Sequence, residues 1–333
     1  MTDARLVSEF SEEQLIARIA NFLTILDDVE LGPGDDAAVV GAPDGRVVVS
    51  TDVLVEGRHF LRNWISAPDL GRRAMAQNLA DIAAMGARPT AVVVALTIPG
   101  DLPVTWLEDL ARGMGQACLD AGTSLAGGDL CRGDHISIAV TALGSLDGAA
   151  PVLRSGARAG DILAHAGSVG WSAAGFALLE DRAAQPERPF EARAGVSAEE
   201  LMAAHRVPQP PLRAGIAAQQ AGASAMLDVS DGLLRDAGRI AAASNVVLDL
   251  DEAAIAAWEE SLREAAEHVG ASGRDWVLSG GEDHGLLATF PSDATLPGAF
   301  TAIGRVLATA GEPGVLISGQ PTQIPPGWDH FSG

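Results

Sequence analysis

Lysine is absent from this chain of 333 residues, so arginine supplies all 22 of its basic side chains. A chain without lysine has no Walker A phosphate loop, no protein-kinase strand lysine and no Schiff-base mechanism. Phosphate groups would have to be bound by metal ions, arginine and backbone amides. Cysteine is scarce too, because Cys118 and Cys131 are the only two, and their spacing suits neither a metal site nor a disulfide framework. We therefore expect a reduced, cytoplasmic location.

Long hydrophobic runs and an excess of positive charge are also missing. The longest apolar run, around residues 91–98, is far shorter than the roughly 20 residues of a membrane helix. The acidic N-terminus has no basic segment followed by an apolar one, so we expect no secretory signal. The net charge of −22 would repel nucleic acids and anionic membranes. Neither is expected among the partners.

The pattern of helices and strands predicts two α/β (α+β) domains, as expected for 333 residues of which 47% are hydrophobic. Residues 1–147 and 148–333 are expected to form these domains, joined through "DGAAP". A helix is predicted after Ser11, which has the properties of an N-cap. The two apolar runs in "DDAAVVGAPDGRVVVSTD" predict a hairpin, and residues 181–199 are expected to form a polar surface excursion.

Five acidic motifs share one layout, and most of them lie where an apolar strand ends in Gly, Ser or Thr. They are "GDDAA" (Asp35, Asp36), "STD" (Asp52), "NLAD" (Asp81), "GGD" (Asp129) and "DVSDG" (Asp228, Asp231). Taken singly, most are more typical of a turn or a helix cap than of a ligand. Asp81 differs because its neighbours are apolar, and a carboxylate there needs a partner or a metal. Together the motifs favour several Mg²⁺ ions, which bind oxygen ligands and would offset the charge of reacting phosphates.

Other common sites are not supported by the sequence. The glycine loop "GSVGWSAAG" follows a predicted strand, but its spacing differs from the dinucleotide-binding G-x-G-x-x-G pattern. The seven histidines show no spacing typical of zinc ligands, and no G-x-S-x-G motif of a serine hydrolase is present. The acidic motifs are therefore the main indication of function.

Eight motifs, in order along the whole chain, resemble the thiamine-monophosphate kinase family. They are "GPGDDAAVV", "STDVLVEGRHF", "NLADIAAMGARP", "GGDLCRGD", "LRSGARAGD", "LDVSDGL", "SGGEDHGLL" and "GWDHF". The resemblance implies two α/β domains of the aminoimidazole ribonucleotide synthetase-like fold, with the N-terminal domains of a homodimer pairing into a β-barrel. It also implies Mg²⁺-dependent transfer of the γ-phosphoryl group of ATP onto thiamine monophosphate, which yields thiamine diphosphate and ADP.

Site residues follow from the same resemblance, position by position. Mg²⁺ ligands are implied at Asp36, Ser50, Thr51, Asp52, Asp81, Asp129, Asp228 and Asp231. Contacts with ATP are implied for Gly128, Asp129, Arg154 and Ser230. The thiamine phosphate site is implied to contain His59, Glu282 and Trp328. The family usually has Tyr-Glu after "GGED", whereas this chain has His284 and Gly285, so the contacts of that tyrosine or glutamate cannot be transferred.

Physical chemistry agrees with such a reaction. A phosphate monoester has a second pKa of about 6, so the acceptor oxygen is already ionised at neutral pH and no general base is expected. The main barrier is repulsion between two polyanions, which metal-assisted alignment reduces. The indole of Trp328 could offer a cation–π surface to the thiazolium ring, or it could serve only in packing.

Two other functions were weighed against a kinase. One is an ATP-dependent synthetase or ligase of the same superfamily that acts on a ribonucleotide amide. The other is a non-catalytic protein that buffers divalent cations. "VEGRHF" and "GWDHF" disfavour the synthetase, and the absence of EF-hand spacing disfavours the cation buffer.

Asp35 and Asp36 are expected to differ in role. Successive strand residues point to opposite faces, so one ion cannot take both in the same way. The resemblance assigns the metal to Asp36, and Asp35 is expected to accept backbone amide bonds in the glycine loop. We predict that Asp36→Asn loses far more Mg²⁺-dependent activity than Asp35→Asn in steady-state assays. Equal losses would reject this division.

Overall fold

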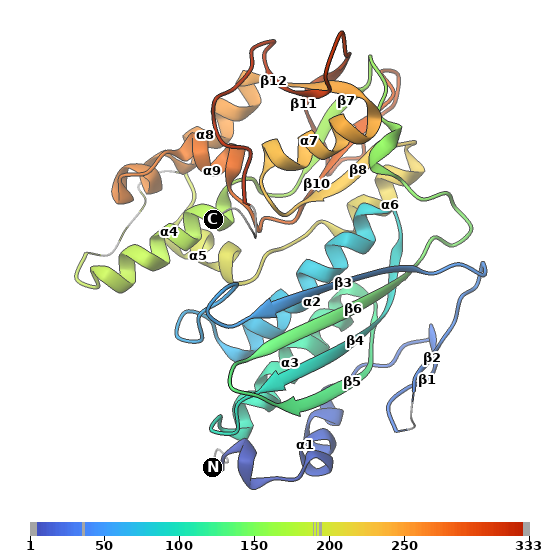
Figure 1. Ribbon diagram of the computed structural model, residues 1–333, viewed down its shortest axis with the longest axis vertical. Coiled ribbons are helices and arrows are strands. Elements are labelled where there is room, and N and C mark those ends of the chain that lie inside the picture. Colours follow the sequence, from blue (N-terminus) through green and yellow to red (C-terminus); the bar gives the residue numbers. More distant parts are fainter. Residues whose placement is uncertain (1–4, 35–36, 189, 191, 193–194, 329–333) are drawn as a thin grey trace. The chain divides into compact units, whose positions relative to one another are not determined.

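The structure, a computed structural model, describes residues 5–34, 37–188, 190, 192 and 195–328. The chain divides into two compact units (Figure 1). The first contains Met1–Ile82 and Ala87–Ala149, and the second contains Ala83–Gly86 and Ala150–Gly333. Asp35 and Asp36 lie outside the described residues. Within the described part of the chain, no helix is long and apolar enough to cross a membrane.

The first unit combines a four-stranded sheet with helices. Its elements are η1 (Val7–Glu9), α1 (Glu12–Ile19), η2 (Ala20–Phe22), β1 (Val29–Leu31), β2 (Val39–Val40), β3 (Val48–Val55), α2 (Ala67–Ala84), β4 (Arg88–Ile98), α3 (Val104–Ala121), β5 (Ser124–Arg132) and β6 (Ser137–Ser145). The sheet has the order β3-β6-β4-β5, with β4 and β5 parallel and the other neighbours antiparallel. The short strands β1 and β2 form a separate antiparallel pair.

Helix ends in the first unit follow local sequence signals. The Ser11 hydroxyl accepts the backbone amide of Gln14, and the Gln14 side chain accepts the amide of Ser11, so α1 begins with a reciprocal capping box. Helix α3 ends at Gly122, whose φ of 69° is the left-handed conformation that glycine adopts without a Cβ penalty. The helix predicted after Ser11 is therefore confirmed.

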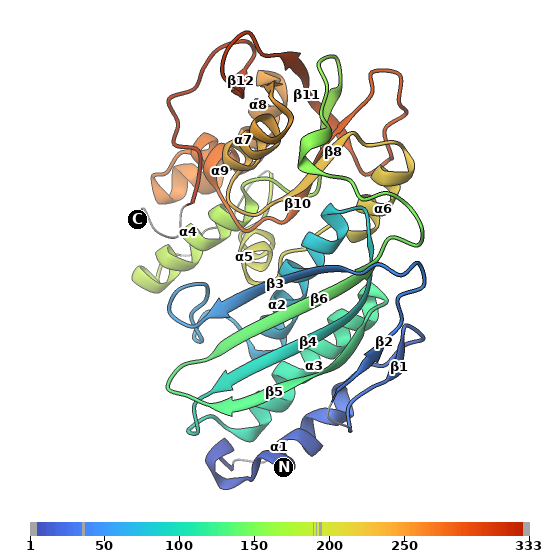
Figure 2. The same cartoon turned by 45° about the vertical axis from the view of Figure 1, so that its right-hand side comes forward.

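Helices cover one face of the four-stranded sheet, and on the opposite face Val29 and Val40 of the β1–β2 pair join Ala91 and Leu143 in a hydrophobic cluster that covers part of it. In Figures 1 and 2, α2 and α3 lie on the same side of the sheet. Strand residues on that side, such as Leu54, Val140 and Val92, are almost fully buried. On the opposite side, Val49 and Val53 of β3 are 62% and 43% exposed. We refer to this opposite side as the open face.

The second unit has a six-stranded sheet in the order β12-β9-β11-β7-β10-β8. Its elements are η3 (Arg154–Gly156), β7 (Ile162–Ala166), α4 (Trp171–Ala184), α5 (Ala198–Arg206), α6 (Leu212–Gln220), β8 (Ala225–Val229), α7 (Leu233–Ser244), β9 (Val246–Leu250), α8 (Glu252–Val269), α9 (Gly273–Ser279), β10 (Gly285–Phe290), β11 (Thr301–Ala308) and β12 (Gly314–Ile317). Only β12 and β9 pair in parallel; the other neighbours are antiparallel.

Helices pack against the second sheet from both sides. Ala214 and Ala218 of α6 join a core cluster with Met226 of β8 and with residues of β7 and β10. On the other side, the ring of His165 in β7 meets Trp258 of α8 edge to face, with 5.6 Å between ring centres. The connection that leaves the edge strand β8 therefore begins in a well-packed layer.

The predicted hairpin in the first unit is wrong. Strand β2 pairs with β1, through Val29 and Val40, whereas β3 pairs along its whole length with β6. The long β3 finds in β6 a partner of similar length, which the two-residue β2 cannot provide. The surface excursion expected at residues 181–199 is also partly wrong, because α4 extends to Ala184 and α5 begins at Ala198. The predicted class of mixed helices and strands is confirmed.

Candidate functional site

Asp81 lies on the covered side of the first sheet, together with part of β3. The Ser50 hydroxyl donates to Asp81 Oδ2 at 2.6 Å. Nearly one turn earlier in α2, the side-chain oxygen of Asn78 accepts the backbone amide of Asp52 at 3.0 Å, and its nitrogen donates to the Ala74 carbonyl. These bonds join β3 to α2. They also give the Asp81 carboxylate a polar partner, which its apolar sequence neighbours cannot provide.

Thr51 and Asp129 lie instead on the open face. Thr51 accepts a hydrogen bond from the hydroxyl of Thr141 at 3.1 Å, and Asp129 is exposed opposite Ala95 of β4. Gly128 faces the covered side, where a Cβ would lie 1.9 Å from a backbone carbonyl oxygen of β4, so only glycine fits there. The Mg²⁺ ligands predicted in the first unit are thus divided between two faces. A single ion within this unit cannot take side chains from both.

His59 follows β3 in a short turn. Its Nδ1 accepts the backbone amide of Val55 at 2.9 Å. The neighbouring Glu56 pairs with Arg62 at 2.6 Å and accepts the amide of Ile136. Because Nδ1 is an acceptor, a neutral His59 ring carries its proton on Nε2. The turn therefore fixes both the orientation and the tautomer of the ring.

In the second unit, residues 230–232 form the β8–α7 loop, which bears two predicted site residues. The backbone amides of Ser230 and Asp231 donate to one carboxylate oxygen of Asp236 at 3.0 and 2.9 Å. Arg239 donates to the other oxygen of Asp236 and, at 2.6 Å, to the Asp231 carboxylate. Burial raises the pKa of Asp236 to about 6, against the lowering effect of the amide bonds and of Arg239. Sequence reasoning missed Asp236 and Arg239, because both lie inside an ordinary helical pattern.

The backbones of Glu282 and Trp328 bind the same loop from two other segments. The Glu282 amide donates to the Ser230 carbonyl at 2.8 Å, and the Trp328 amide donates to the Asp231 carbonyl at 3.0 Å. A Cβ at Gly327 would lie 2.1 Å from that Asp231 oxygen, so only glycine permits this approach. Residues predicted for ATP, Mg²⁺ and thiamine phosphate are thus joined to one another by backbone hydrogen bonds. The Trp328 side chain remains 56% exposed.

His284 stands between two acids of the predicted site. Its Nδ1 lies 3.2 Å from Asp228 Oδ2, and its Nε2 lies 3.7 Å from Glu282 Oε2, which is an ion-pair distance rather than a hydrogen bond. Burial favours the neutral ring, but the two acids outweigh burial and raise the pKa of His284 to about 10.

Asp283, the acid next to Glu282, has a different function. Its side chain is buried and accepts the backbone amides of Gly170 at 2.6 Å and Ser172 at 2.9 Å, at the start of α4. Burial raises the pKa of Asp283 to about 6, and the amide bonds oppose that rise. Asp283 is a helix cap. The motif "GGED" thus places one acid toward the site and the next into the core.

Arg154 lies in η3, beside α7. Its side chain is exposed, and its backbone carbonyl accepts the Ser244 hydroxyl at 2.7 Å. This bond ties η3 to the last turn of α7. The exposed Arg154 guanidinium thus belongs to η3, which is bonded to α7, the helix that follows the β8–α7 loop.

The donor chemistry of the predicted metal ligands suits Mg²⁺. Within the described ranges, no group of three or more His, Cys, Asp or Glu side chains converges closely enough to hold an ion. Mg²⁺ does not require such a group, because it usually keeps several waters and binds one or two carboxylates plus substrate phosphates. The Asp81 carboxylate beside the Ser50 hydroxyl is a donor set of that kind.

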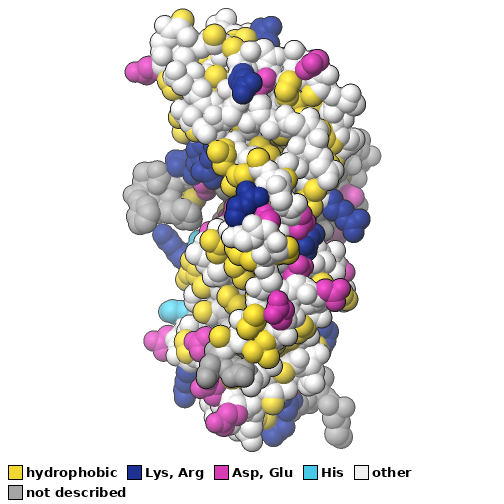
Figure 3. All heavy atoms as spheres, turned by 90° about the vertical axis from the view of Figure 1, so that its right-hand side faces the viewer, with side chains coloured by type: hydrophobic (Ala, Val, Ile, Leu, Met, Phe, Trp, Pro, Cys, Tyr) yellow, Lys and Arg dark blue, Asp and Glu magenta, His cyan; other side chains and the backbone are white. Residues whose placement is uncertain are grey.

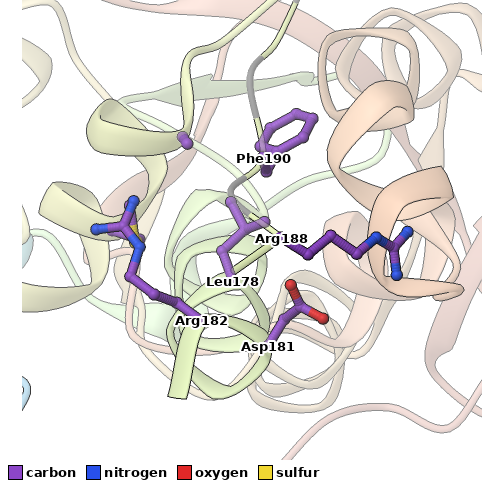
Figure 4. Close-up of a pocket in the computed structure, with 7 residues that line it drawn as sticks. Leu178, Asp181, Arg182, Arg188 and Phe190 are labelled. Atoms are coloured by element: carbon purple, nitrogen blue, oxygen red, sulfur yellow. The ribbon is translucent and has the colours of Figure 1, made fainter. Parts of the chain in front are cut away.

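A small pocket lies apart from these residues, between α4, α5 and the segment that joins them (Figure 4). It is lined by Leu178, Asp181, Arg182, Arg188, Phe190, Ala198 and Met202, and its volume is about 10 Å³. Such a volume holds about one water molecule and excludes a nucleotide. On the face in Figure 3, basic side chains lie singly or in small groups with acidic ones nearby, so this face has no broad basic surface of the kind that binds nucleic acid.

Comparison with known proteins gives consistent matches over the whole chain. Residues 34–146 match the family described as AIR synthase related protein, N-terminal domain, and residues 158–313 match its C-terminal domain. The thiamine-monophosphate kinase of Mycobacterium tuberculosis (strain ATCC 25618 / H37Rv) is 45% identical over 334 residues, which cover 99% of this chain and 94% of that protein.

Solved structures agree with these matches. The crystal structure of thiamine monophosphate kinase from Aquifex aeolicus has a TM-score of 0.73 and 31% identity, covering 84% of this chain and 90% of that one. A structure described as "AaThiL complexed with AMPPCP and TMP" has a TM-score of 0.74 and 29% identity, with 98% of each chain covered. The expected family and its two-domain α/β fold are confirmed.

The two acids of "GGED" should respond differently to loss of charge. Asp283→Asn leaves one acceptor oxygen for two buried amides, so we predict a loss of about 1–3 kcal/mol in the free energy of unfolding. Glu282→Gln, at a half-exposed side chain that lies 3.7 Å from His284, should lower that free energy by less than Asp283→Asn does. Chemical denaturation followed by circular dichroism measures both. Equal stability of the two variants would show that Asp283 is not the cap of α4.

Proposed function

The chain belongs to the thiamine-monophosphate kinase family, and on this premise we propose that it phosphorylates thiamine monophosphate with ATP. The γ-phosphoryl group of ATP moves onto the phosphate of the acceptor, and the products are thiamine diphosphate and ADP. The observation that carries this proposal is the 45% identity to a thiamine-monophosphate kinase over 99% of the chain. The use of ATP also agrees with the cytoplasmic location expected from the sequence.

The reaction requires alignment of two phosphates rather than proton abstraction. The acceptor phosphate, with a second pKa of about 6, is already a nucleophile at neutral pH. What the protein must supply is an in-line arrangement of the reacting groups and compensation of their charge. No general base is expected for this chemistry.

The site residues proposed for this reaction are those that the resemblance implies. ATP is assigned to Gly128, Asp129, Arg154 and Ser230, and thiamine phosphate to His59, Glu282 and Trp328. Mg²⁺ is assigned to Asp36, Ser50, Thr51, Asp52, Asp81, Asp129, Asp228 and Asp231. This assignment is supported by the hydrogen bonds between the β8–α7 loop and the backbones of Glu282 and Trp328. They connect a residue proposed to bind ATP with two proposed to bind thiamine phosphate.

Bound Mg²⁺ would neutralise and align the phosphates during transfer. The side chains of this chain supply oxygen donors for it, and they hold those donors in fixed positions. The Ser50 hydroxyl orients the Asp81 carboxylate, and His284 orients that of Asp228. Each carboxylate is thus positioned by a partner before any ion is bound.

We further propose that two chains pair through the open face of the first sheet to form a homodimer. Val49 and Val53 expose apolar surface there, on the edge strand β3. Residues 1–147 would then serve as the nucleotide-binding, Mg²⁺-binding and dimerisation domain, and residues 148–333 as the C-terminal α/β domain. A monomeric mass in sedimentation equilibrium at micromolar concentration would contradict this pairing.

The activity is tested by phosphorus NMR. Purified protein, ATP, Mg²⁺ and thiamine monophosphate should give ADP and the two phosphorus resonances of thiamine diphosphate. Omission of Mg²⁺ or addition of a chelator should stop the reaction. Failure to form thiamine diphosphate, alongside turnover of a ribonucleotide amide, would replace the kinase with a synthetase.

The Asp81→Asn variant tests whether Asp81 binds Mg²⁺ or only stabilises the fold. The amide can still accept the Ser50 hydrogen bond, but it is a poor ligand for Mg²⁺, so activity should fall about 100-fold or more at an unchanged melting temperature. Asp109→Asn is the matched control, because it removes a surface acid of α3 that pairs with Arg112. Near-normal activity of Asp81→Asn would remove Asp81 from the metal site.

A further inference from the structure

We propose that Asp236 and Arg239 are positioning residues that set the shape of the β8–α7 loop for both substrates at once. Neither residue belongs to the ATP, Mg²⁺ or thiamine phosphate sets given above. The inference rests on the proposed function, because it concerns how the residues of that site are held. It gives two residues of α7, which lie outside the sequence motifs, the role of holding the loop in place.

The backbone of the loop is fully engaged. Its two leading residues, Ser230 and Asp231, have two amides and two carbonyls. Both amides donate to one oxygen of Asp236, at 3.0 and 2.9 Å. The two carbonyls accept the amides of Glu282 and Trp328, at 2.8 and 3.0 Å. Of the three partners, Glu282 and Trp328 bind the loop through their backbone amides, and Asp236 binds it through its side chain. A substitution therefore removes the contact at Asp236, whereas it would leave the other two contacts in place.

Asp236 would be costly to bury without compensation. Its side chain has no exposed surface, and a carboxylate there without a charged partner would lose its hydration and gain no ion pair to compensate. Arg239, one turn later in α7, supplies the compensating charge. It binds the second oxygen of Asp236 and reaches the Asp231 carboxylate at 2.6 Å. The Arg239 guanidinium thus holds both Asp236, which binds the loop amides, and the side chain of Asp231 in the loop.

This arrangement links the two substrates mechanically. A shift of Ser230 and Asp231 would move the residues proposed for ATP and Mg²⁺. The same shift would pull on the amides of Glu282 and Trp328, which are proposed to line the thiamine phosphate site. Loss of Asp236 should therefore affect both substrates, whereas a residue that only stabilised the start of α7 would affect neither in the folded protein.

The test compares three variants of the full chain with the wild type. In Asp236→Asn, an NH₂ group replaces one oxygen, so the side chain cannot accept both loop amides and Arg239 together. Arg239→Met keeps the apolar stem and removes the charge, and Arg239→Lys restores a charge that lacks the planar fork. Arg263→Met is the matched control, because it breaks exposed ion pairs with Glu260 and Glu267 on α8.

Two readouts are expected to move together. Hydrogen–deuterium exchange in peptides covering residues 228–232 and 325–328 should accelerate about tenfold or more in Asp236→Asn and Arg239→Met, as expected for a lost buried hydrogen bond. The kcat for thiamine diphosphate formation should fall about tenfold or more, with KM raised for both ATP and thiamine monophosphate. Arg239→Lys should recover part of each change, and Arg263→Met should match the wild type.

Other outcomes would overturn the proposal. Unchanged exchange in both segments, with wild-type kcat and KM per folded molecule, would leave Asp236 with a purely structural role. A change in KM for one substrate alone would refute the link between them. If the wild type forms no thiamine diphosphate, the proposed function fails, and the exchange comparison still decides whether Asp236 and Arg239 hold the loop.

Discussion

A carboxylate that is buried in the second unit must be compensated by protein donors, because it has no access to water. Asp236 meets this requirement with two backbone amides of the β8–α7 loop and with Arg239. The need to satisfy one buried charge therefore determines where the loop lies. The strand before it and the helix after it hold the loop ends, and the amides of Glu282 and Trp328 complete its contacts. Much of the geometry of the proposed site in this unit follows from that one group.

The first unit is governed by the alternation of side chains along a strand. Ser50 and Thr51 are neighbours in β3, yet Ser50 faces α2 and Thr51 faces the open side of the sheet. Polar residues that look continuous in the sequence are thereby sorted into two groups. The covered group is held by hydrogen bonds within the unit. In the open group, Thr51 bonds to Thr141 and to the Val140 carbonyl within the sheet, and Asp129 is exposed.

The sequence predicted those elements whose signals are local. The Ser11 cap acts within a few residues, and the helix predicted after it is present. The pairing of β3 with β6 was missed, because strand partners are chosen by burial and length across the whole chain rather than by the nearest turn. The same limit applies to the site. Acids at strand ends could be found from their motifs, whereas Asp236 looks like any polar residue of a helix.

The contacts of the β8–α7 loop with Glu282 and Trp328 have a consequence for how the family can diversify. Both contacts use backbone amides, so they do not depend on which side chains stand at these two positions, with proline as the exception. The side chains of Glu282 and Trp328 can therefore be replaced by mutation while the backbone of the β8–α7 loop keeps the same hydrogen bonds. New acceptor preferences could arise in this scaffold without rebuilding its phosphate chemistry.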